Sequence, residues 1–245
     1  MNALRADQQQ LQHYVEELSR MINAEGYPCV GAKAVVARHQ LNTFVAGDIR
    51  DPHNDRAIAD FLYAFIDRYR RDRSVLCSAG VIFDEPTNLT EPQFEEFLWK
   101  RLQALADIDA EAYAYDFRVS SAPADNNFGF SIYSEALYVI GLHPGSSRRA
   151  RRFSRPAIIF NPHAQFEWLR ARGKYDAMKR AVRQRDLEYS GSVNPMLGDF
   201  GLSSEAVQYS GMQHGNSWKC PFASGHQRNE DHSPENGHSV SPETR

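Results

Sequence analysis

This sequence has few cysteines, no long hydrophobic run and almost no net charge. Its three cysteines are Cys29, Cys77 and Cys220. An odd, sparse count differs from the disulfide framework of small secreted proteins and indicates a reducing compartment. No stretch approaches the roughly 20 apolar residues that cross a bilayer, and residues 1–10 are polar, unlike the apolar core of a signal peptide. These absences predict a cytoplasmic protein with no membrane partner.

The small net charge also limits the partners. A formal charge of −3 does not create the positive field that attracts nucleic acid, so we expect no nucleic-acid partner. Hydrophobic residues make up 42% of the 245 residues. This content can bury a sizeable core, and the length suits one large domain.

Hydrophobic periodicity predicts an alternation of helices and strands. Thr90 followed by Gln93 has the pattern of a capping box and marks the start of one helix. Residues 38–53, which contain Asp51 and Pro52, are expected to form a polar loop. Helices are expected over 8–24 and 54–70, from Thr90 to about 105, and over 163–187 with an interruption at Gly173; strands are expected over 29–37, 74–83, 128–142 (strand or hairpin) and 156–160.

The elements alternate too loosely for strict βα units, so the sequence predicts a mixed α/β (α+β) fold. We expect a single domain over residues 1–222, with a mixed sheet flanked by helices. Residues 223–245 are polar and are expected to form a disordered tail, because they cannot offset their ordering entropy. Its histidines, His226, His232 and His238, are weak metal-ligand candidates because of their spacing.

No strong local catalytic signature is present: the chain lacks a glycine-rich phosphate loop, a nucleophile elbow and a zinc motif. His163 follows an apolar strand and precedes a helix, with Asn161 in position to cap that helix. A neutral imidazole at such a junction can ligate a heme iron or another metal. The alternative is a histidine that packs and hydrogen-bonds at a helix end.

Cys220 lies between Trp218 and Phe222, next to Lys219. A thiolate here would be a second candidate for an axial heme ligand, whereas a small buried thiol would only anchor the last ordered segment. An arginine run follows residue 147. Arginine pairs with carboxylates through two hydrogen bonds, as the two heme propionates would require, although a solvated loop is the simpler interpretation. The run consists of Arg148, Arg149, Arg151, Arg152 and Arg155.

Three carboxylates, Glu135, Asp199 and Glu205, interrupt apolar or loop segments. A buried carboxylate requires a partner, and a cationic substrate is one candidate while an arginine of the chain is the commoner one. A different arrangement, in which His143, His163 and a carboxylate hold a non-heme metal, is also compatible with these residues.

Several blocks of the sequence, in order from Tyr27 to Phe222, resemble the YqcI/YcgG family. The resemblance is carried by Tyr27-Pro28-Cys29-Val30-Gly31-Ala32-Lys33-Ala34, Gly141-Leu142-His143-Pro144, Ser147-Arg148, Ala150-Arg151-Arg152-Phe153, Phe160-Asn161-Pro162-His163, Phe166-Glu167, Leu169-Arg170, Gly173-Lys174-Tyr175, Met178, Asn194-Pro195-Met196-Leu197, Asp199-Phe200-Gly201, Ser204-Glu205-Ala206, Gln208-Tyr209-Ser210-Gly211 and Trp218-Lys219-Cys220-Pro221-Phe222.

The resemblance implies a heme protein. Characterised members of that family are heme-dependent N-hydroxylases of guanidine groups, on arginine or arginine-derived compounds in natural-product biosynthesis. It implies one heme b, with His163 as proximal ligand and Cys220 as its rival, dioxygen or peroxide as co-substrate and an external electron donor. Glu135 is expected to hold the guanidinium, with Asp199 and Glu205 as further candidates. A heme-binding or redox-sensing protein without turnover is the alternative function.

Overall fold

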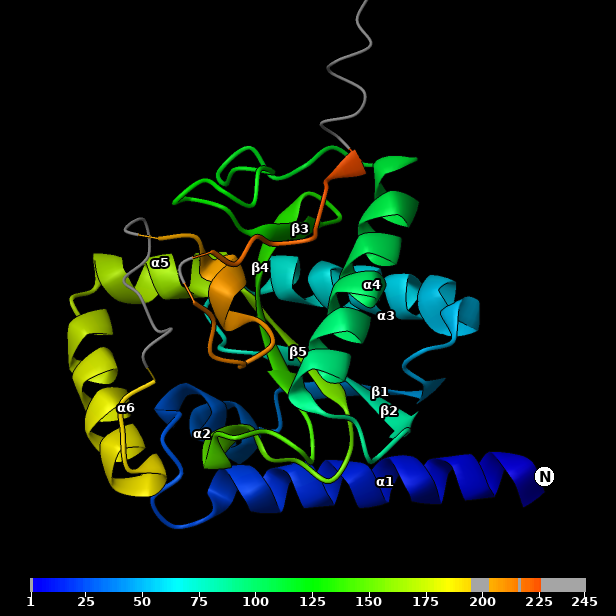
Figure 1. Cartoon of the computed structure of the whole chain (residues 1–245), viewed down its shortest axis with the longest axis horizontal. Coiled ribbons are helices and arrows are strands. Elements are labelled where there is room, and N and C mark those ends of the chain that lie inside the picture. Colours follow the sequence, from blue (N-terminus) through cyan, green and yellow to red (C-terminus); the bar gives the residue numbers. More distant parts are fainter. Residues whose placement is uncertain (1, 195–202, 216, 226–245) are drawn as a thin grey trace, which may run out of the picture.

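The structure, a computed structural model, describes residues 2–194, 203–215 and 217–225. A five-stranded sheet lies between two groups of helices (Figure 1). The strands are β1 (Leu41–Asp48), β2 (Ser78–Glu85), β3 (Phe130–Ile132), β4 (Glu135–Leu142) and β5 (Ala157–Pro162); the α-helices are α1 (Asn2–Asn23), α2 (Val30–Ala37), α3 (Asp55–Arg71), α4 (Glu91–Ala110), α5 (His163–Ala171) and α6 (Tyr175–Ser190); the 3-10 helices are η1 (Pro52–Asn54), η2 (Arg149–Arg151) and η3 (Glu205–Gln208).

The sheet is mixed, as the sequence predicted. Its strand order is β1-β2-β5-β4-β3. β1 pairs with β2 in parallel, while β2 with β5, β5 with β4 and β4 with β3 pair antiparallel. A doubly wound fold would require a mainly parallel sheet, so this pairing confirms the mixed α+β fold class.

Both faces of the sheet are buried. Successive side chains of a strand point to opposite faces, so Val81 of β2 joins the cluster under α3 and α4, while Ile82 joins the cluster under α1 and α2. Phe65 of α3 and Leu98 of α4 fill the first cluster, and Leu18 of α1 fills the second. The two layers of helices therefore rest on different faces of one sheet.

Local sequence signals correctly predicted the start of α4, the β3–β4 hairpin and the break between α5 and α6. The Thr90 hydroxyl and the Gln93 side chain form the expected capping box of α4. Residues 128–142 form a hairpin in which the turn residues Tyr133 and Ser134 both have positive φ, as in a two-residue turn that follows the strand twist. Gly173, with φ of 65°, separates α5 from α6.

The structure of two segments was predicted wrongly. Residues 29–37 were expected to be extended, but α2 occupies most of this segment, and the Cys29 Sγ accepts a hydrogen bond from the Ala32 amide at its start. A short run of small and β-branched residues fits either structure, and burial against the sheet decides between them. Residues 41–48 were expected to be a polar loop, but they form β1. β1 is an edge strand that is mostly half-buried, which is why polar residues obscure its alternation.

The start of α5 also differs from the expected cap. Asn161 and Pro162 belong to β5, and Pro162 is the residue before the helix, with no side-chain cap. Asn161 instead bonds the Ser78 hydroxyl and the Tyr138 carbonyl across the sheet.

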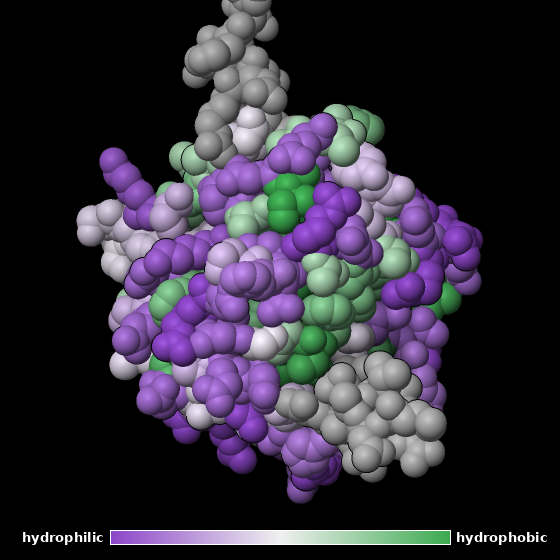
Figure 2. All heavy atoms as spheres, turned by 90° about the vertical axis from the view of Figure 1, so that its right-hand side faces the viewer, coloured by the Kyte–Doolittle hydropathy of each residue, from purple (hydrophilic) through white to green (hydrophobic). Residues whose placement is uncertain are grey.

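Hydrophilic side chains cover most of the face shown in Figure 2, around a smaller band of hydrophobic ones. Among the described helices, none combines the length and apolar character needed to cross a membrane.

Candidate functional site

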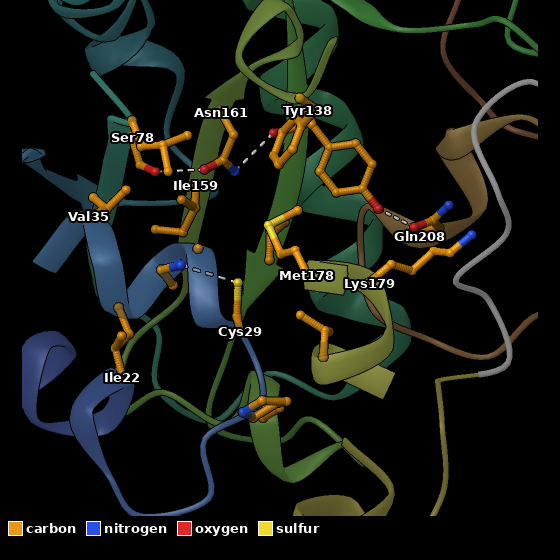
Figure 3. A pocket seen from close by; sticks show the side chains of 18 of the residues that line it. Ile22, Cys29, Val35, Ser78, Tyr138, Ile159, Asn161, Met178, Lys179 and Gln208 are labelled. Carbon is orange, nitrogen blue, oxygen red and sulfur yellow. Dashed lines mark hydrogen bonds between the residues drawn. The ribbon is translucent and has the colours of Figure 1, made fainter. Parts of the chain in front are cut away.

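A cavity of about 300 Å³ lies on the face of the sheet that α1 and α2 cover, at the lower end of the roughly 300–1,000 Å³ typical of ligand pockets. Figure 3 shows side chains of α1, α2, β4, β5 and α6 turned toward this space. Its lining is mainly apolar and includes Leu18, Ile22, Val35, Ile159, Leu169 and Met178.

An imidazole and a carboxylate meet at the wall of this cavity. His163 begins α5 directly after β5, at the strand–helix junction that the sequence predicted, and is 8% exposed. Its Nε2 lies 3.0 Å from the carboxylate of Glu205, which begins η3 and is buried. The Tyr209 hydroxyl donates a hydrogen bond to the same carboxylate. Glu205 thus orients the imidazole, as carboxylates commonly do for metal-ligating histidines.

Glu135, the expected substrate anchor, lies on the other face of the sheet. It shares a face with Leu137 of the α3–α4 cluster, whereas Tyr138 faces the cavity, as the alternation along β4 requires. The Glu135 carboxylate is 1% exposed and pairs with three arginines, at 2.8 Å from Arg118, 3.1 Å from Arg73 and 3.5 Å from Arg70. This corrects the predicted role: the charges of the chain itself neutralise Glu135, and it is not part of the cavity.

The arginine run divides into cavity-lining and outward-facing residues. Arg148 and Arg151 line the cavity, but Arg152 does not: it donates to the carbonyls of Ser146 and Ser147. The predicted clamp role of Arg152 therefore has no support at this cavity.

The two arginines of this run that line the cavity already have partners. Arg148 pairs with Asp186 at 2.7 Å. Arg151 is buried and donates to the carbonyls of Gly141, Gln208 and Tyr209, and this burial lowers its pKa. Both guanidinium groups thus already hold the surrounding backbone in place.

Three further cations, Arg170, Lys179 and Arg183, line the cavity from α5 and α6. Together with Arg148 and Arg151 they make five cationic side chains, against the two carboxylates of Asp186 and Glu205. Asp186 is already bonded by Arg148 and by the amide of Asn194. Arg170 also pairs with Glu167, and Lys179 lies 4.0 Å from Asp176, both outside the lining. The lining thus combines apolar walls with more cations than carboxylates, a composition that suits an apolar ligand with anionic groups.

Sequence reasoning missed these α6 residues. Lys179 and Arg183 are four positions apart and alternate with Met178 and Val182 on the same side of α6, so that side combines apolar and cationic residues. This combination of apolar and cationic residues on one side of a helix could have indicated the site from the sequence. The chain has 28 Lys and Arg residues, however, so many segments show a similar combination.

Cys220 does not line the cavity. It packs beside Trp218 against the α3–α4 cluster, and burial raises the pKa of its thiol to about 12. This burial disfavours the thiolate form that axial ligation requires. Of the two candidate ligands, His163 lines the cavity and Cys220 does not; Cys220 packs the last described segment against the core.

His143 is separate from the cavity as well. Its ring stacks on Phe94 with 4.4 Å between centroids, and burial lowers its pKa to about 4. Among the described residues, no three histidine, cysteine or acidic side chains gather into a metal site. The alternative in which His143 and His163 hold a non-heme metal therefore has no support in the described part of the chain. Asp199 and the three tail histidines lie outside the described residues.

Comparisons with known proteins identify a family. A family model described as the YqcI/YcgG family matches residues 18–223. The chain is similar to a protein of Bacillus subtilis (strain 168) named "Uncharacterized protein YcgG", with 26% identity over 186 residues, which cover 73% of this chain and 72% of that protein. No solved structure matches the chain significantly. The match over most of its length shows that the chain belongs to the YqcI/YcgG family.

Proposed function

We propose that this protein is a heme b-dependent monooxygenase that N-hydroxylates a guanidine group of arginine or an arginine-derived compound. The observation that carries the proposal is the composition of the cavity: apolar walls, one buried imidazole and five cations against two carboxylates. Heme b matches this composition with its apolar macrocycle, its iron and its two propionates. The guanidine substrate rests on the family resemblance alone.

The residues present fit the group. His163 would ligate the iron, while Glu205 holds the imidazole through Nε2 at 3.0 Å. Arg170, Lys179 and Arg183 would pair with the propionates, because they line the cavity from the side of α5 and α6. Arg148 and Arg151 would add positive charge while they keep their bonds to the protein.

When bound, the heme would supply the activation of dioxygen or peroxide, with electrons from an external donor. The side chains of the protein perform the remaining tasks. Apolar residues such as Ile22, Val35 and Met178 exclude water from the cavity. The carboxylate of Glu205 fixes the orientation of His163 and accepts the hydrogen bond of Tyr209. Its pairing with His163 makes Glu205 a positioning residue, so Asp199 is the remaining predicted anchor for the guanidinium.

Hemin titration of the purified protein tests the proposal. We expect saturable binding of about one heme per chain, which His163→Ala abolishes or shifts spectrally and Glu205→Gln weakens. His53→Ala is the matched control, because the side chain of His53 is 88% exposed and does not line the cavity. Weak, non-saturating binding in the wild type, or unchanged binding in His163→Ala, would contradict the heme assignment.

Turnover is tested separately with the loaded protein. Incubation with arginine and other guanidino compounds, an electron source and dioxygen should give a product that is heavier by one oxygen atom. Saturable heme binding without any oxygenated product would instead favour the heme-binding or redox-sensing function without turnover.

A further inference from the structure

A series of aromatic rings connects the wall of the cavity with the protein surface. Tyr138 lines the cavity, and its ring centroid lies 6.2 Å from those of His163 and Tyr209. Tyr209 stacks on Trp99 with 5.6 Å between centroids, and Trp99 lies 6.3 Å from Trp218. The centroids of neighbouring rings in the series are therefore 6.3 Å apart or less.

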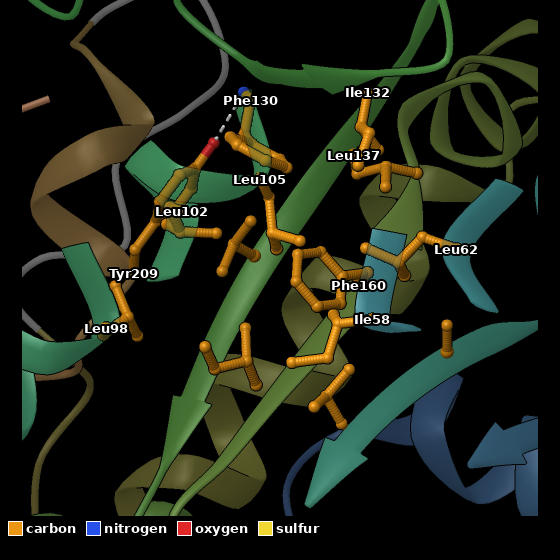
Figure 4. Packing of buried hydrophobic residues seen from close by; sticks show 14 of the residues in the cluster. Ile58, Leu62, Leu98, Leu102, Leu105, Phe130, Ile132, Leu137, Phe160 and Tyr209 are labelled. Carbon is orange, nitrogen blue, oxygen red and sulfur yellow. Dashed lines mark hydrogen bonds between the residues drawn. The ribbon is translucent and has the colours of Figure 1, made fainter. Parts of the chain in front are cut away.

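The two ends of the series have different environments. Tyr209 is fully buried; Figure 4 shows it at one end of the core cluster, with its hydroxyl turned to the amide of Phe130. Trp99, on α4, is 3% exposed. Trp218 is half-buried, stacks on His214 at 4.3 Å and is followed by the exposed Lys219. The series therefore runs from the interior to the surface.

The hydrogen bonds along the series suit one-electron transfer. Oxidation of a phenol releases its proton, and the Tyr209 hydroxyl already donates to the Glu205 carboxylate, which can accept that proton. Burial and the nearby Glu205 raise the pKa of Tyr209, so the phenol keeps its proton until it is oxidised. The Trp99 Nε1 is buried without a hydrogen-bond partner among the described residues. An oxidised Trp99 would therefore have no base to take its proton, and the electron vacancy would pass on to Trp218.

We propose that Tyr209, Trp99 and Trp218 form a relay that carries single electrons between the cavity and the surface. The direction of flow rests on the proposed function, in which an oxidant forms in the cavity from dioxygen or peroxide. If no substrate consumes that oxidant, it takes one electron from Tyr209, and the phenol proton passes to the Glu205 carboxylate, which leaves a neutral tyrosyl radical.

The relay then returns Tyr209 to its starting state. Trp99 supplies one electron and Glu205 returns the proton, which restores the phenol. Trp218 reduces Trp99, and a thiol in solution gives one electron to Trp218, releases its proton to water and becomes a thiyl radical. Two such discharges give two thiyl radicals, which combine into one disulfide. The relay thus protects the cavity from damage by discharging an unused oxidant at the surface.

Flash photo-oxidation of the heme-free protein tests the relay without the proposed cofactor. A soluble ruthenium tris-bipyridine photo-oxidant with persulfate oxidises surface tryptophan, and transient absorption follows the tryptophan and tyrosine radicals. Because the photo-oxidant acts at the surface end, the electron vacancy travels inward along the same rings, opposite to the discharge direction, and we expect a tyrosyl signal that grows as the tryptophan radical decays. Most of this delayed signal should be lost in Tyr209→Phe, Trp99→Phe and Trp218→Phe.

The control variant is Trp168→Phe, because Trp168 is also half-buried but lies on α5 against Arg172, outside the series. It should keep the delayed tyrosyl signal. Glu205→Gln should slow the growth of that signal, because an amide is a poor proton acceptor. Melting curves establish that each variant is folded.

A delayed tyrosyl signal that survives Trp218→Phe, or that falls equally in Trp168→Phe, would overturn the relay. Failure of hemin to bind would overturn the proposed function and leave this measurement intact. A positive photo-oxidation result together with absent heme binding would keep the electron path and remove the proposed source of the oxidant.

Discussion

Glu135 offers a sharp test of whether its carboxylate serves the fold or a ligand. We expect Glu135→Gln to lower the free energy of unfolding and to leave hemin binding in the cavity unchanged. The carboxylate is 1% exposed, and it contacts Arg70, Arg73 and Arg118, whose side chains are 31%, 46% and 38% exposed. The amide would keep some hydrogen bonds but none of the charge attraction.

The magnitude follows from these exposures. Breaking a fully buried ion pair costs about 3–5 kcal/mol, mainly because it leaves a buried charge without a partner. Here the arginines that remain are accessible to water, and solvent screens each pair toward the roughly 0.2–1 kcal/mol of surface pairs. Three such pairs together correspond to a loss of about 2 kcal/mol. For a chain of this size, that loss lowers the melting temperature by about 4–8 °C.

Urea denaturation monitored by circular dichroism measures this loss, because urea does not screen charge as guanidinium chloride does. Glu96→Gln is the control: Glu96 pairs with Lys100, but both side chains are more than half exposed, so a change below about 0.5 kcal/mol is expected. If Glu135→Gln kept full stability but weakened the binding of guanidino compounds, the structural assignment of Glu135 would be wrong and the substrate-anchor hypothesis would return.

Three further predictions concern packing, pH and the end of the domain. Gly141→Ala should destabilise the protein by about 1–3 kcal/mol, since a Cβ there would lie 2.6 Å from the Phe94 ring; unchanged urea denaturation would contradict this close packing. The free energy of unfolding should fall as the pH drops from about 6.5 toward 4. The unfolded chain protonates His143 near its ordinary pKa of 6.5, whereas burial holds the pKa of the folded His143 near 4. His143→Gln should flatten this part of the curve of unfolding free energy against pH, and an unchanged slope would show that His143 is not its cause. A chain that ends at Gly225 should keep the melting temperature and hemin binding of the full chain. The cut comes three residues after Phe222, where the sequence predicted the domain to end, because Ser224 is 1% exposed. A chain that ends at Lys219 should melt lower, since it loses the buried Phe222.

Local signals predicted most of the elements because their information lies in neighbouring residues. The capping box at Thr90 and the positive φ at Gly173 depend on interactions within one or two turns. The apolar residues of α3 repeat on one side of the helix, and this is the side that the structure buries. By contrast, α2 and β1 were misjudged, because short segments take their structure from the surface against which they pack.

The candidate site was predictable only in part. His163 was found because a strand end followed by a helix start can be identified from the sequence, and the structure places its imidazole at the cavity. Which carboxylate would meet it was not predictable, since Glu205 is 42 residues further along the chain.

The sequence alone therefore determined the mixed fold class, the membership in one family and the position of one histidine at a strand–helix junction. The tertiary structure decided which charges share a space. Glu135 and Tyr138 are three positions apart on β4, and this odd spacing places them on opposite faces of the sheet. Lys179 and Arg183 of α6 line the same cavity as Glu205 of η3. Packing between segments that are distant in the sequence brings these charged groups together, so no local sequence pattern predicts which of them meet.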